Sequence, residues 1–513
     1  MRIREAGRYL KGLESLAGVY ITHIIVLLTL TCFAFALLNL NSIRILPPAQ
    51  TPFVVVAENF AREGRLSYHG APYTLYPPMI IVSMAAFIKA GFDALTAFKL
   101  LNIVCYALSC ILIYRLSASM NLDRATSAAA ALIYASTPAA LFHALDYMPD
   151  TLFSFICLLW FYLFNSRKYA QAGVVASFAS VTRLQGLLLL IFGAAYLILI
   201  RRNFRTAAAY SLLSVLMPLL WGLRNIDVLT NHYGMPLQTL LSKPQLIYMS
   251  GLVQSDLSQA PALPKPHLLL FFTLAFLVPI SGSFVAVGLL GGLGRTRLMA
   301  AFTLSYFLMH VTLPGGMDNI VRHLLAAVPF ISIWAAAGVR RAVSTLQCRN
   351  LALAAVLGVM VVAQINIVRT DIRNTNLTRQ GMLDGVMWLD ANLPGNATVV
   401  DMMEDVNSLP FSSYYSKMRF TYSPALIGTY SPMSKYAFRQ VSPDYLADDT
   451  ELGRMAPEEY VDYVLAPERI LHKLPGWRVV HTFSVPTKAQ NPPVKVLVLE
   501  NPRRQTNITT CGL

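Results

Sequence analysis

The sequence predicts a polytopic α-helical membrane protein followed by a small soluble α/β domain, and three observations predict it. Of the 513 residues, 55% are hydrophobic and only 13% are charged, which is outside the range of soluble globular chains. Apolar runs approach the roughly 20 residues that one bilayer crossing needs. Of the 26 Asp and Glu residues, 11 precede residue 369 and 15 lie in the last 145 positions. We therefore expect a membrane domain over 1–368 and an extracytoplasmic domain over 369–513.

The apolar runs predict a bundle of about 11 spans. They lie near 18–40, 97–115, 126–141, 151–166, 169–182, 185–200, 206–222, 267–291, 298–313, 323–339 and 351–367. The run at 79–91, which follows Pro77 and Pro78, is short for a crossing. It predicts a re-entrant or interfacial helix.

The basic residues predict the orientation. A net charge of +15 would suggest a nucleic-acid partner in a soluble chain, but here Lys and Arg cluster in short loops, where they set topology. No nucleic-acid partner is expected, and the contacts of the predicted spans are membrane lipids. The loop residues that fall on one side are Arg115, Arg124, Arg167, Lys168, Arg201, Arg202, Arg205, Arg295, Arg297, Arg340, Arg341 and Arg349. This pattern predicts a multi-pass plasma or inner membrane protein with a cytoplasmic N-terminus and an extracytoplasmic tail.

Two carboxylates stand out at the boundary of a predicted span, in the segment Leu-Phe-His-Ala-Leu-Asp-Tyr-Met-Pro-Asp at 141–150. A charge at membrane depth costs several kcal/mol unless it is solvated, paired or functional. Asp146 and Asp150 are therefore candidate site residues, with His143 as a supporting candidate. The alternatives are a hydrated loop without chemistry and a histidine that only makes structural hydrogen bonds.

The first outer loop predicts a short amphipathic helix on the membrane surface. Val54, Ala57, Phe60 and Ala61 recur at helical spacing, and Gly64 supplies a stop. Glu58 lies on or near the polar side of this helix and is a further candidate, although a solvated helix face is the simpler explanation for it. Lys89, in the short apolar helix, would reach either a lipid phosphate or the interface.

Several motifs occur in a characteristic order: a helix in the first outer loop, the Pro77-Pro78 pair, and the Asp-containing loop. These are followed by Thr182-Arg183, Arg224-Asn225, and Arg-His-Leu-Leu-Ala-Ala-Val-Pro-Phe at 322–330. With these motifs the chain resembles the GT-C superfamily of integral-membrane glycosyltransferases, especially its protein-mannosyltransferase and aminoarabinose-transferase branch. The resemblance covers roughly residues 15–370.

The resemblance implies transfer of a sugar from a polyprenyl-phosphate-linked donor to a lipid, glycan or protein acceptor at the extracytoplasmic face. Such chemistry needs a carboxylate base and cations for the departing phosphate. The candidates for the base are Asp146, Asp150 and Glu58. The candidates for the phosphate are Arg183, Arg224, Arg322 and Lys89, although Arg224 and Arg322 would also serve as interfacial anchors. Asn225 and His323 join His143 as supporting residues. No cofactor is required, and a divalent cation on Asp146 and Asp150 is compatible with the sequence.

One departure from the family pattern concerns the start of the first outer loop. Members of this family usually carry an acidic residue, taken to be the base, at a position that corresponds to about 49–51, and this chain has Gln50. Glutamine cannot accept a proton, so either another carboxylate does that job or this loop aligns differently with the family. A further alternative is an inactive relative that serves as a partner subunit. The remaining alternative is a transporter or flippase of lipid-linked saccharides, which would place charges along a path through the membrane.

The tail predicts a helix followed by strands. The helix is expected over 381–393, ended by Pro394 and Gly395. Extended segments rich in Val, Tyr, Phe and Thr are expected at 397–400, 418–422, 460–465, 477–485 and 494–499.

Overall fold

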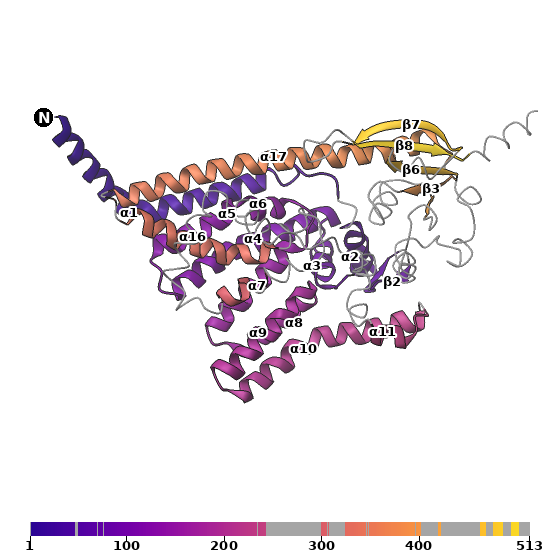
Figure 1. Ribbon diagram of the computed structural model, residues 1–513, viewed down its shortest axis with the longest axis horizontal. Helices are drawn as coiled ribbons and strands as arrows, with labels where there is room; N and C mark the ends of the chain where they lie inside the picture. The colour runs from indigo at the N-terminus through magenta and orange to yellow at the C-terminus, as the bar shows by residue number, and fades with distance from the viewer. Residues whose placement is uncertain are drawn as a thin grey trace, which may run out of the picture. The chain divides into compact units, whose positions relative to one another are not determined.

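The computed structural model describes residues 2–46, 50–68, 70–74, 76–232, 234–242, 299–304, 306, 324–344, 346, 348–394, 397–401, 419–421, 462–467, 476–485 and 494–501. These residues are mainly helical (Figure 1). The chain divides into two compact units: the first comprises Met1–Ser42, Phe98–Trp221 and Leu257–Asp371, and the second comprises Ile43–Ala97, Gly222–Asp256 and Ile372–Leu513. Each unit is described by itself.

The first unit is helical in its described residues. Its elements, some of which continue into the second unit, are α1 (Arg2–Leu38), α4 (Ala94–Ser119), α5 (Arg124–Ser136), α6 (Pro138–Leu145), α7 (Asp150–Asn165), α8 (Tyr169–Ser180), η2 (Leu184–Gly186), α9 (Leu187–Ala195), η3 (Tyr196–Ile200), α10 (Phe204–Asp227), η7 (Leu324–Ala327), α16 (Val328–Val343) and α17 (Arg349–Asn392).

Five described helical segments are long and apolar enough to cross a membrane: Tyr20–Leu38, Ala94–Ser119, Phe204–His232, Leu324–Val343 and Arg349–Asn392. Each coincides with a predicted span, and the chain is an integral membrane protein. The predicted runs at 151–166, 169–182 and 185–200 form shorter helices. The run at 267–291 lies outside the described residues, as does most of 298–313, so the count of about 11 spans stays a prediction.

The predicted span at 126–141 is not a single straight helix. It consists of α5 and α6, which are bent by 55° at Thr137. Pro138 causes the break, because proline has no N–H to donate and its ring clashes with the preceding turn. Side chains satisfy carbonyl oxygens near the bend: the Tyr106 hydroxyl donates to Ala135 O and the Thr137 hydroxyl donates to Ile133 O.

Helix packing builds the core of the first unit. α5 packs against α1 and α16, and α7 packs against α8 and η7. Aromatic rings fill the space beside α7: the Phe161 ring lies 4.5 Å from that of Phe330 and 5.1 Å from that of Phe302, between centroids. The buried indole of Trp160 donates to the hydroxyl of Tyr210. These contacts fix α7, the helix that begins at Asp150.

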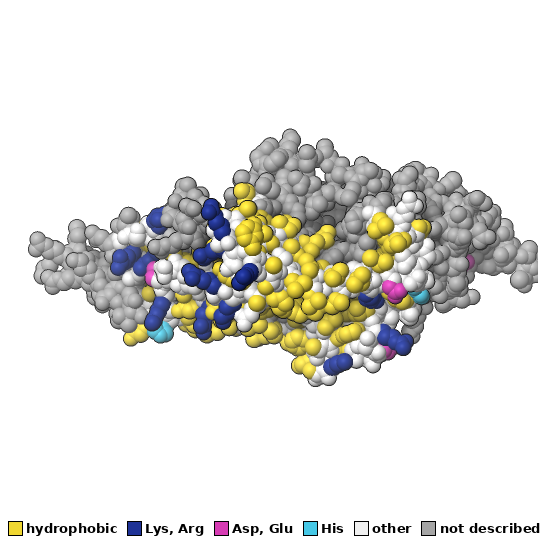
Figure 2. All heavy atoms as spheres, turned by 90° about the horizontal axis from the view of Figure 1, so that it is seen from below, with side chains coloured by type: hydrophobic (Ala, Val, Ile, Leu, Met, Phe, Trp, Pro, Cys, Tyr) yellow, Lys and Arg dark blue, Asp and Glu magenta, His cyan; other side chains and the backbone are white. Residues whose placement is uncertain are grey.

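Exposed basic residues lie near several helix ends in the first unit. Arg115 is near the end of α4, Arg124 is the first residue of α5, Arg167 and Lys168 join α7 to α8, and Arg341 is in the last turn of α16. Figure 2 shows a broad field of hydrophobic side chains, with most of the visible Lys and Arg at one end of it and a few at the other. The cytoplasmic side that the sequence assigns to these residues stays a prediction.

The second unit begins with the first loop. It contains α2 (Thr51–Glu63), the hairpin strands β1 (Ser67–Tyr68) and β2 (Ala71–Pro72), and α3 (Met79–Lys89). The predicted helix and its stop are confirmed: α2 ends at Gly64, whose φ of 71° suits glycine and whose N–H donates to Phe60 O. α2 packs on α3. At 11 residues, α3 is about 16 Å long, which is shorter than the hydrocarbon core of roughly 30 Å.

Two helices extend beyond the predicted spans at 206–222 and 351–367. The helix α10 continues through Arg224 and Asn225 to Asp227 and is followed by η4 (Val228–His232), and α11 (Leu237–Ser242) comes next. No glycine or proline interrupts 223–232, so nothing stops the helix there. Likewise, α17 runs unbroken for 44 residues across the expected domain boundary at 368–369 and includes most of the helix predicted at 381–393.

All five extended segments predicted in the tail contain strands. These are β3 (Thr398–Asp401), β5 (Arg419–Thr421), β6 (Tyr463–Pro467), β7 (Arg478–Val485) and β8 (Val494–Glu500), and they form one sheet in the order β5-β3-β6-β8-β7. β3 is parallel to β5 and β6, whereas β8 is antiparallel to β6 and β7. The Trp388 ring of α17 stacks on His481 of β7 at 4.2 Å. A separate soluble α/β domain over 369–513 stays a prediction.

Candidate functional site

The two aspartates of the predicted acidic segment lie at the turn between α6 and α7. Asp146 caps the C-terminus of α6, and Asp150 is in the first turn of α7. Both side chains are buried, at 1% and 2% exposure. An acidic residue in the first turn of a helix is favoured by the helix dipole. Neither aspartate is a solvated loop residue, so the hydrated-loop alternative is wrong in structural terms.

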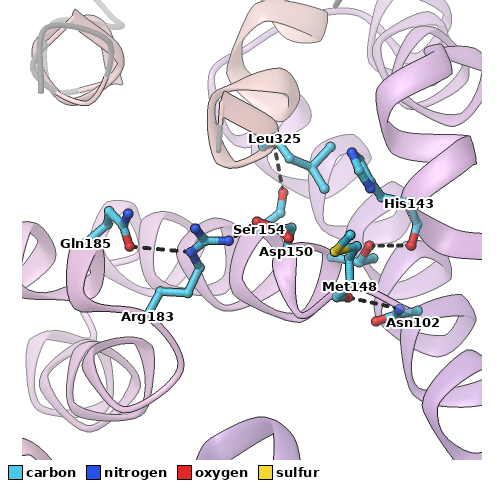
Figure 3. A network of polar contacts seen from close by, with 9 residues as sticks. Asn102, His143, Met148, Asp150, Ser154, Arg183, Gln185 and Leu325 are labelled. Carbon is cyan, nitrogen blue, oxygen red and sulfur yellow. Dashed lines mark hydrogen bonds and ion pairs between the residues drawn. The ribbon is translucent and has the colours of Figure 1, made fainter. Parts of the chain in front are cut away.

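Asp150 forms an ion pair with Arg183, which lies 33 positions later in the chain (Figure 3). The guanidinium of Arg183 also donates from Nε to the side-chain oxygen of Gln185 at 3.4 Å. Pairing satisfies two charges that would be costly to bury separately. Two residues that the sequence singles out for different roles, base and phosphate ligand, are therefore in direct contact.

Local backbone structure places Arg183. α8 ends at Ser180, and the N–H of Arg183 donates to Ala179 O, which turns the chain back toward η2 and α9. Gly186 makes this turn fit, because a Cβ at that position would come within 2.2 Å of the Ala179 carbonyl carbon. Only glycine is compatible with such a close backbone approach.

Two residues that sequence reasoning missed bind the acidic turn, the segment 146–150 between α6 and the start of α7. Asn102 of α4 donates from Nδ2 to Asp146 O at 2.8 Å and to Met148 O at 3.0 Å. One helical turn earlier, Lys99 lies 4.9 Å from the centre of the Tyr147 ring and donates to Leu40 O at 2.6 Å. Both are buried within an apolar helix. The available signal was that two polar residues spaced i, i+3 share one face of a predicted span.

Of the two supporting histidines, the structure describes only His143. His143 is buried in α6, and its carbonyl oxygen accepts a hydrogen bond from the Thr151 hydroxyl at 3.1 Å. It is therefore near the start of α7, as Figure 3 shows. Arg322 and His323 lie outside the described residues. The segment that follows them is described from Leu324, and Leu325 O accepts from the Ser154 hydroxyl at 3.2 Å.

A second group of predicted residues lies in the other unit. Arg224 donates to Tyr73 O at 2.6 Å, to Leu66 O at 3.3 Å, and to the side-chain oxygen of its neighbour Asn225 at 2.9 Å. Leu66 and Tyr73 flank the β1–β2 hairpin, so Arg224 closes the first loop rather than projecting toward solvent. Asn225 is fully buried.

Burial dominates the electrostatics of the hairpin. Desolvation raises the pKa of the Tyr68 phenol above its usual range, and it raises the pKa of Tyr73 still more clearly, with Tyr76 and Tyr68 adding to the effect. The Phe53 and Tyr76 rings lie 5.2 Å apart. Tyr68 and Tyr73 are therefore neutral packing residues at ordinary pH.

The remaining candidates lie on α2 and α3. Gln50, at the family's usual base position, is the N-cap residue of α2 and is 4% exposed. Glu58 is half-buried on α2, and Lys89 is exposed at the end of α3. Among the residues that the structure describes, no group of three or more His, Cys, Asp or Glu residues could hold a metal ion. A divalent cation at Asp146 and Asp150 stays a prediction.

No protein-family model matches the sequence, and no curated protein is significantly similar to it in sequence. Solved structures do match. ArnT from Cupriavidus metallidurans in the apo state has a TM-score of 0.61 at 11% identity, over 93% of this chain and 97% of ArnT. The same protein bound to undecaprenyl phosphate has a TM-score of 0.59 at 11% identity, over 93% and 98%.

A second protein also matches. The arabinofuranosyltransferase AftD from Mycobacteria has a TM-score of 0.50 at 15% identity, over 92% of this chain and 40% of AftD. The chain thus spans less than half of AftD but nearly all of ArnT. At these identities the likeness concerns the fold, and the predicted resemblance to the GT-C membrane glycosyltransferases is confirmed at that level: the chain has the fold of ArnT.

Proposed function

We propose that this protein is a membrane glycosyltransferase that moves a hexosyl or pentosyl group from a polyprenyl-phosphate-linked donor to a lipid, glycan or protein acceptor. The reaction takes place at the extracytoplasmic face. The donor class is supported by the fold of ArnT, one of whose structures is bound to undecaprenyl phosphate. The site is supported by the residues of the acidic turn.

The contact between Asp150 and Arg183 is the observation that carries the proposal. It joins an acid to a guanidinium in the first unit. Both residues lie at helix ends away from those with exposed Arg and Lys: Asp150 begins α7, whereas Arg167 follows its far end. A guanidinium offers a planar, always-charged set of donors suited to phosphate oxygens. An acid that holds it in place preorganises this set before the donor binds.

The chemistry requires one bond to form and one to break. The acceptor hydroxyl oxygen attacks the anomeric carbon of the donor sugar, and the bond from that carbon to the phosphate oxygen breaks. The hydroxyl proton passes to a carboxylate, and the bonding electron pair leaves with the polyprenyl phosphate. A positioned base contributes about 10²- to 10⁴-fold to such a step.

We assign the roles from the contacts. Asp150 is engaged with Arg183 and orients it, and Arg183 binds the departing phosphate. The base is then Asp146, with Glu58 as the alternative. Arg224 is engaged with the hairpin carbonyls, so we assign it to holding the first loop, with Asn225. Lys89, Arg322 and His323 remain proposed phosphate-side or supporting residues, and His143 a supporting residue of the turn.

A transfer assay on the purified full-length protein in nanodiscs tests the proposal. Radiolabelled hexose and pentose forms of undecaprenyl phosphate are supplied with a membrane extract as acceptor. We expect transfer from at least one donor, and a loss of about 10²-fold in Arg183→Gln and in Asp146→Asn. In a parallel thermal-shift measurement, undecaprenyl phosphate should stabilise the wild type more than undecaprenol does, and Arg183→Gln should abolish the difference.

The matched control is Arg340→Gln. Arg340 also pairs with an aspartate, Asp123, but at 3.7 Å and with both side chains partly exposed. Its loss should leave transfer unchanged. Full activity in Arg183→Gln and Asp146→Asn would contradict the assigned site. If the wild type binds undecaprenyl phosphate without transferring any sugar, the inactive-relative alternative raised by Gln50 is correct. Movement of an intact lipid-linked saccharide across the bilayer would instead identify a flippase.

A further inference from the structure

The acidic turn is held from outside by one helix. Three carbonyl oxygens in or just before the turn accept side-chain hydrogen bonds: His143 O from Thr151, and both Asp146 O and Met148 O from Asn102. Thr151 belongs to the same α6–α7 segment. Asn102, 44 positions before Asp146, comes from α4 (Figure 3).

The need for this contact follows from the sequence of the turn. Carbonyl groups at the end of a helix have no partner within the helix, and Pro149 has no N–H to offer. In a dry interior each unpaired carbonyl is costly. The amide of Asn102 is fully buried, and its NH₂ group must face the turn because both partners are acceptors. A polar residue in an apolar helix is therefore explained by the turn that it serves.

Lys99 acts on the residue between the two carbonyls. Asn102 binds on either side of Tyr147, and Lys99, on the same face of α4, lies against the Tyr147 ring. The Lys99 ammonium group also donates to Leu40 O, just beyond the C-terminus of α1. The Tyr147 ring packs in addition against Phe98 at 5.9 Å. Three neighbouring positions of α4 thus contact the turn, while the Asp146 carboxylate accepts from the Tyr147 N–H at 2.9 Å.

We propose that Asn102 and Lys99 are positioning residues that fix the backbone and ring of the 146–148 turn, and so aim the Asp146 carboxylate at the acceptor hydroxyl. This inference rests on the proposed function for its catalytic consequence, but its structural part stands on the contacts alone. Neither residue touches the substrate. They act through Asp146, because a displacement of about 1 Å at a reacting group can cost on the order of 10²-fold in rate.

Hydrogen exchange of the intact protein tests the structural part. The Asp146 N–H donates to Phe142 O and the Tyr147 N–H to the Asp146 carboxylate, so both amides should be protected. In Asn102→Leu and Lys99→Met, exchange in a peptide covering 145–149 should become faster, while the remainder of α4 stays protected. The matched control is Ser109→Ala, which removes a buried hydroxyl two turns along α4 that donates to Cys105 O. It should change nothing at the turn.

Kinetics test the positioning role. Asn102→Leu should lower kcat by about 10- to 100-fold and leave KM for the donor within about twofold. Asn102→Gln, which keeps the amide donor, should retain more activity than the leucine variant. In an Asp146→Asn background, Asn102→Leu should cause no further loss, because its effect passes through that carboxylate.

Unchanged exchange at 145–149, wild-type kcat in Asn102→Leu, or full additivity with Asp146→Asn would each overturn the proposal. If the wild type transfers no sugar, the proposed function fails and the exchange measurement decides alone. In that case, faster exchange confined to the turn in the Asn102 and Lys99 variants would show that these residues stabilise its backbone. Unchanged exchange would show that they do not.

Discussion

The guanidinium of Arg224 donates a hydrogen bond to the carbonyl oxygen of Tyr73, 151 positions earlier, at 2.6 Å. A second bond from the same side chain reaches Leu66 O at 3.3 Å, so one arginine links both ends of the β1–β2 hairpin to the end of α10. In the sequence this arginine has the pattern of a phosphate ligand. In the structure three of its N–H groups bond to Tyr73 O, Leu66 O and the side chain of Asn225, so it contributes to the geometry of the loop that follows α1.

Replacing Arg224 should therefore loosen the first loop. Arg224→Ala removes two hydrogen bonds to backbone carbonyls, and hydrogen bonds from charged groups contribute roughly 1.5–3 kcal/mol each. Lysine lacks the planar fork and should restore only part of this. Limited proteolysis should cut between 65 and 74 faster in the alanine variant than in Arg65→Ala, a control at an exposed arginine of the same loop. Equal cleavage in both would show that the contact carries no stability.

Gly186 should be irreplaceable. A Cβ there would lie 2.2–2.4 Å from backbone atoms of Ala179 and Ser180, so Gly186→Ala must displace the turn that carries Arg183. We expect a destabilisation of roughly 1–3 kcal/mol from overpacking and a loss of undecaprenyl phosphate binding. Gly358→Ala is the matched control, since a Cβ there has no atom within 4 Å among the described residues. Thermal unfolding and the thermal-shift assay measure both effects, and wild-type binding by the Gly186 variant would contradict the placement of Arg183.

Asp93 should contribute an acid-sensitive part of the stability. It caps α4, where the Thr96 N–H donates to its carboxylate at 3.0 Å. Hydrogen bonds from Thr96 lower the pKa of Asp93 below the usual 3.8. A lowered folded-state pKa means that the stabilisation is present above the unfolded-state value and is lost as the pH falls through the folded-state value.

Asp93→Asn keeps a good N-cap but cannot titrate. The difference in melting temperature between the wild type and this variant should be constant above about pH 5 and should shift in favour of the variant toward about pH 2.5. Thr96→Val should reduce this pH-dependent difference. A difference that does not vary with pH would rule out the titration of Asp93 as its source.

The positive-inside pattern gives a prediction for topology. In a variant without native cysteines, single cysteines at Asn121 and Asn203, in connections next to exposed arginines, should react with a membrane-impermeant maleimide only after the cells are opened. A cysteine at Glu63, exposed at the end of α2, should react in intact cells. Labelling at positions 121 and 203 in intact cells, with position 63 still reactive, would show that α3 crosses the membrane and would invert every later loop.

Local patterns in the sequence predict the elements whose causes are local. The end of α2 at Gly64 and the strands of the tail follow from residues within a few positions of each element. The bend at Pro138 also has a local cause. Hydropathy does not reveal it, because the segments on both sides of Pro138 are apolar and together have the composition of one span. The length of α17 was missed for a related reason: the composition changes at 369 while nothing in the backbone stops the helix.

Contacts between distant residues account for what the sequence could not predict about the site. Asp146, Asp150 and Arg183 stand out as charges at span boundaries, but their spacing does not reveal that Asp150 meets Arg183, since this depends on how α7 and α8 pack. Asn102 and Lys99 lie within the apolar run at 97–115, where two polar residues do not change the prediction of a span. Their role depends on the packing of α4 against the acidic turn, which the sequence does not show.

The pairing of Asp150 with Arg183 also has a consequence for biogenesis. α7 and α8 have 16 and 12 residues, about 24 and 18 Å at 1.5 Å per residue, so neither reaches across a hydrocarbon core of roughly 30 Å. Their charged ends neutralise each other only once both helices lie side by side. We therefore expect the translocon to release α7 and α8 into the lipid together, as one helical hairpin whose exit waits for the synthesis of Arg183.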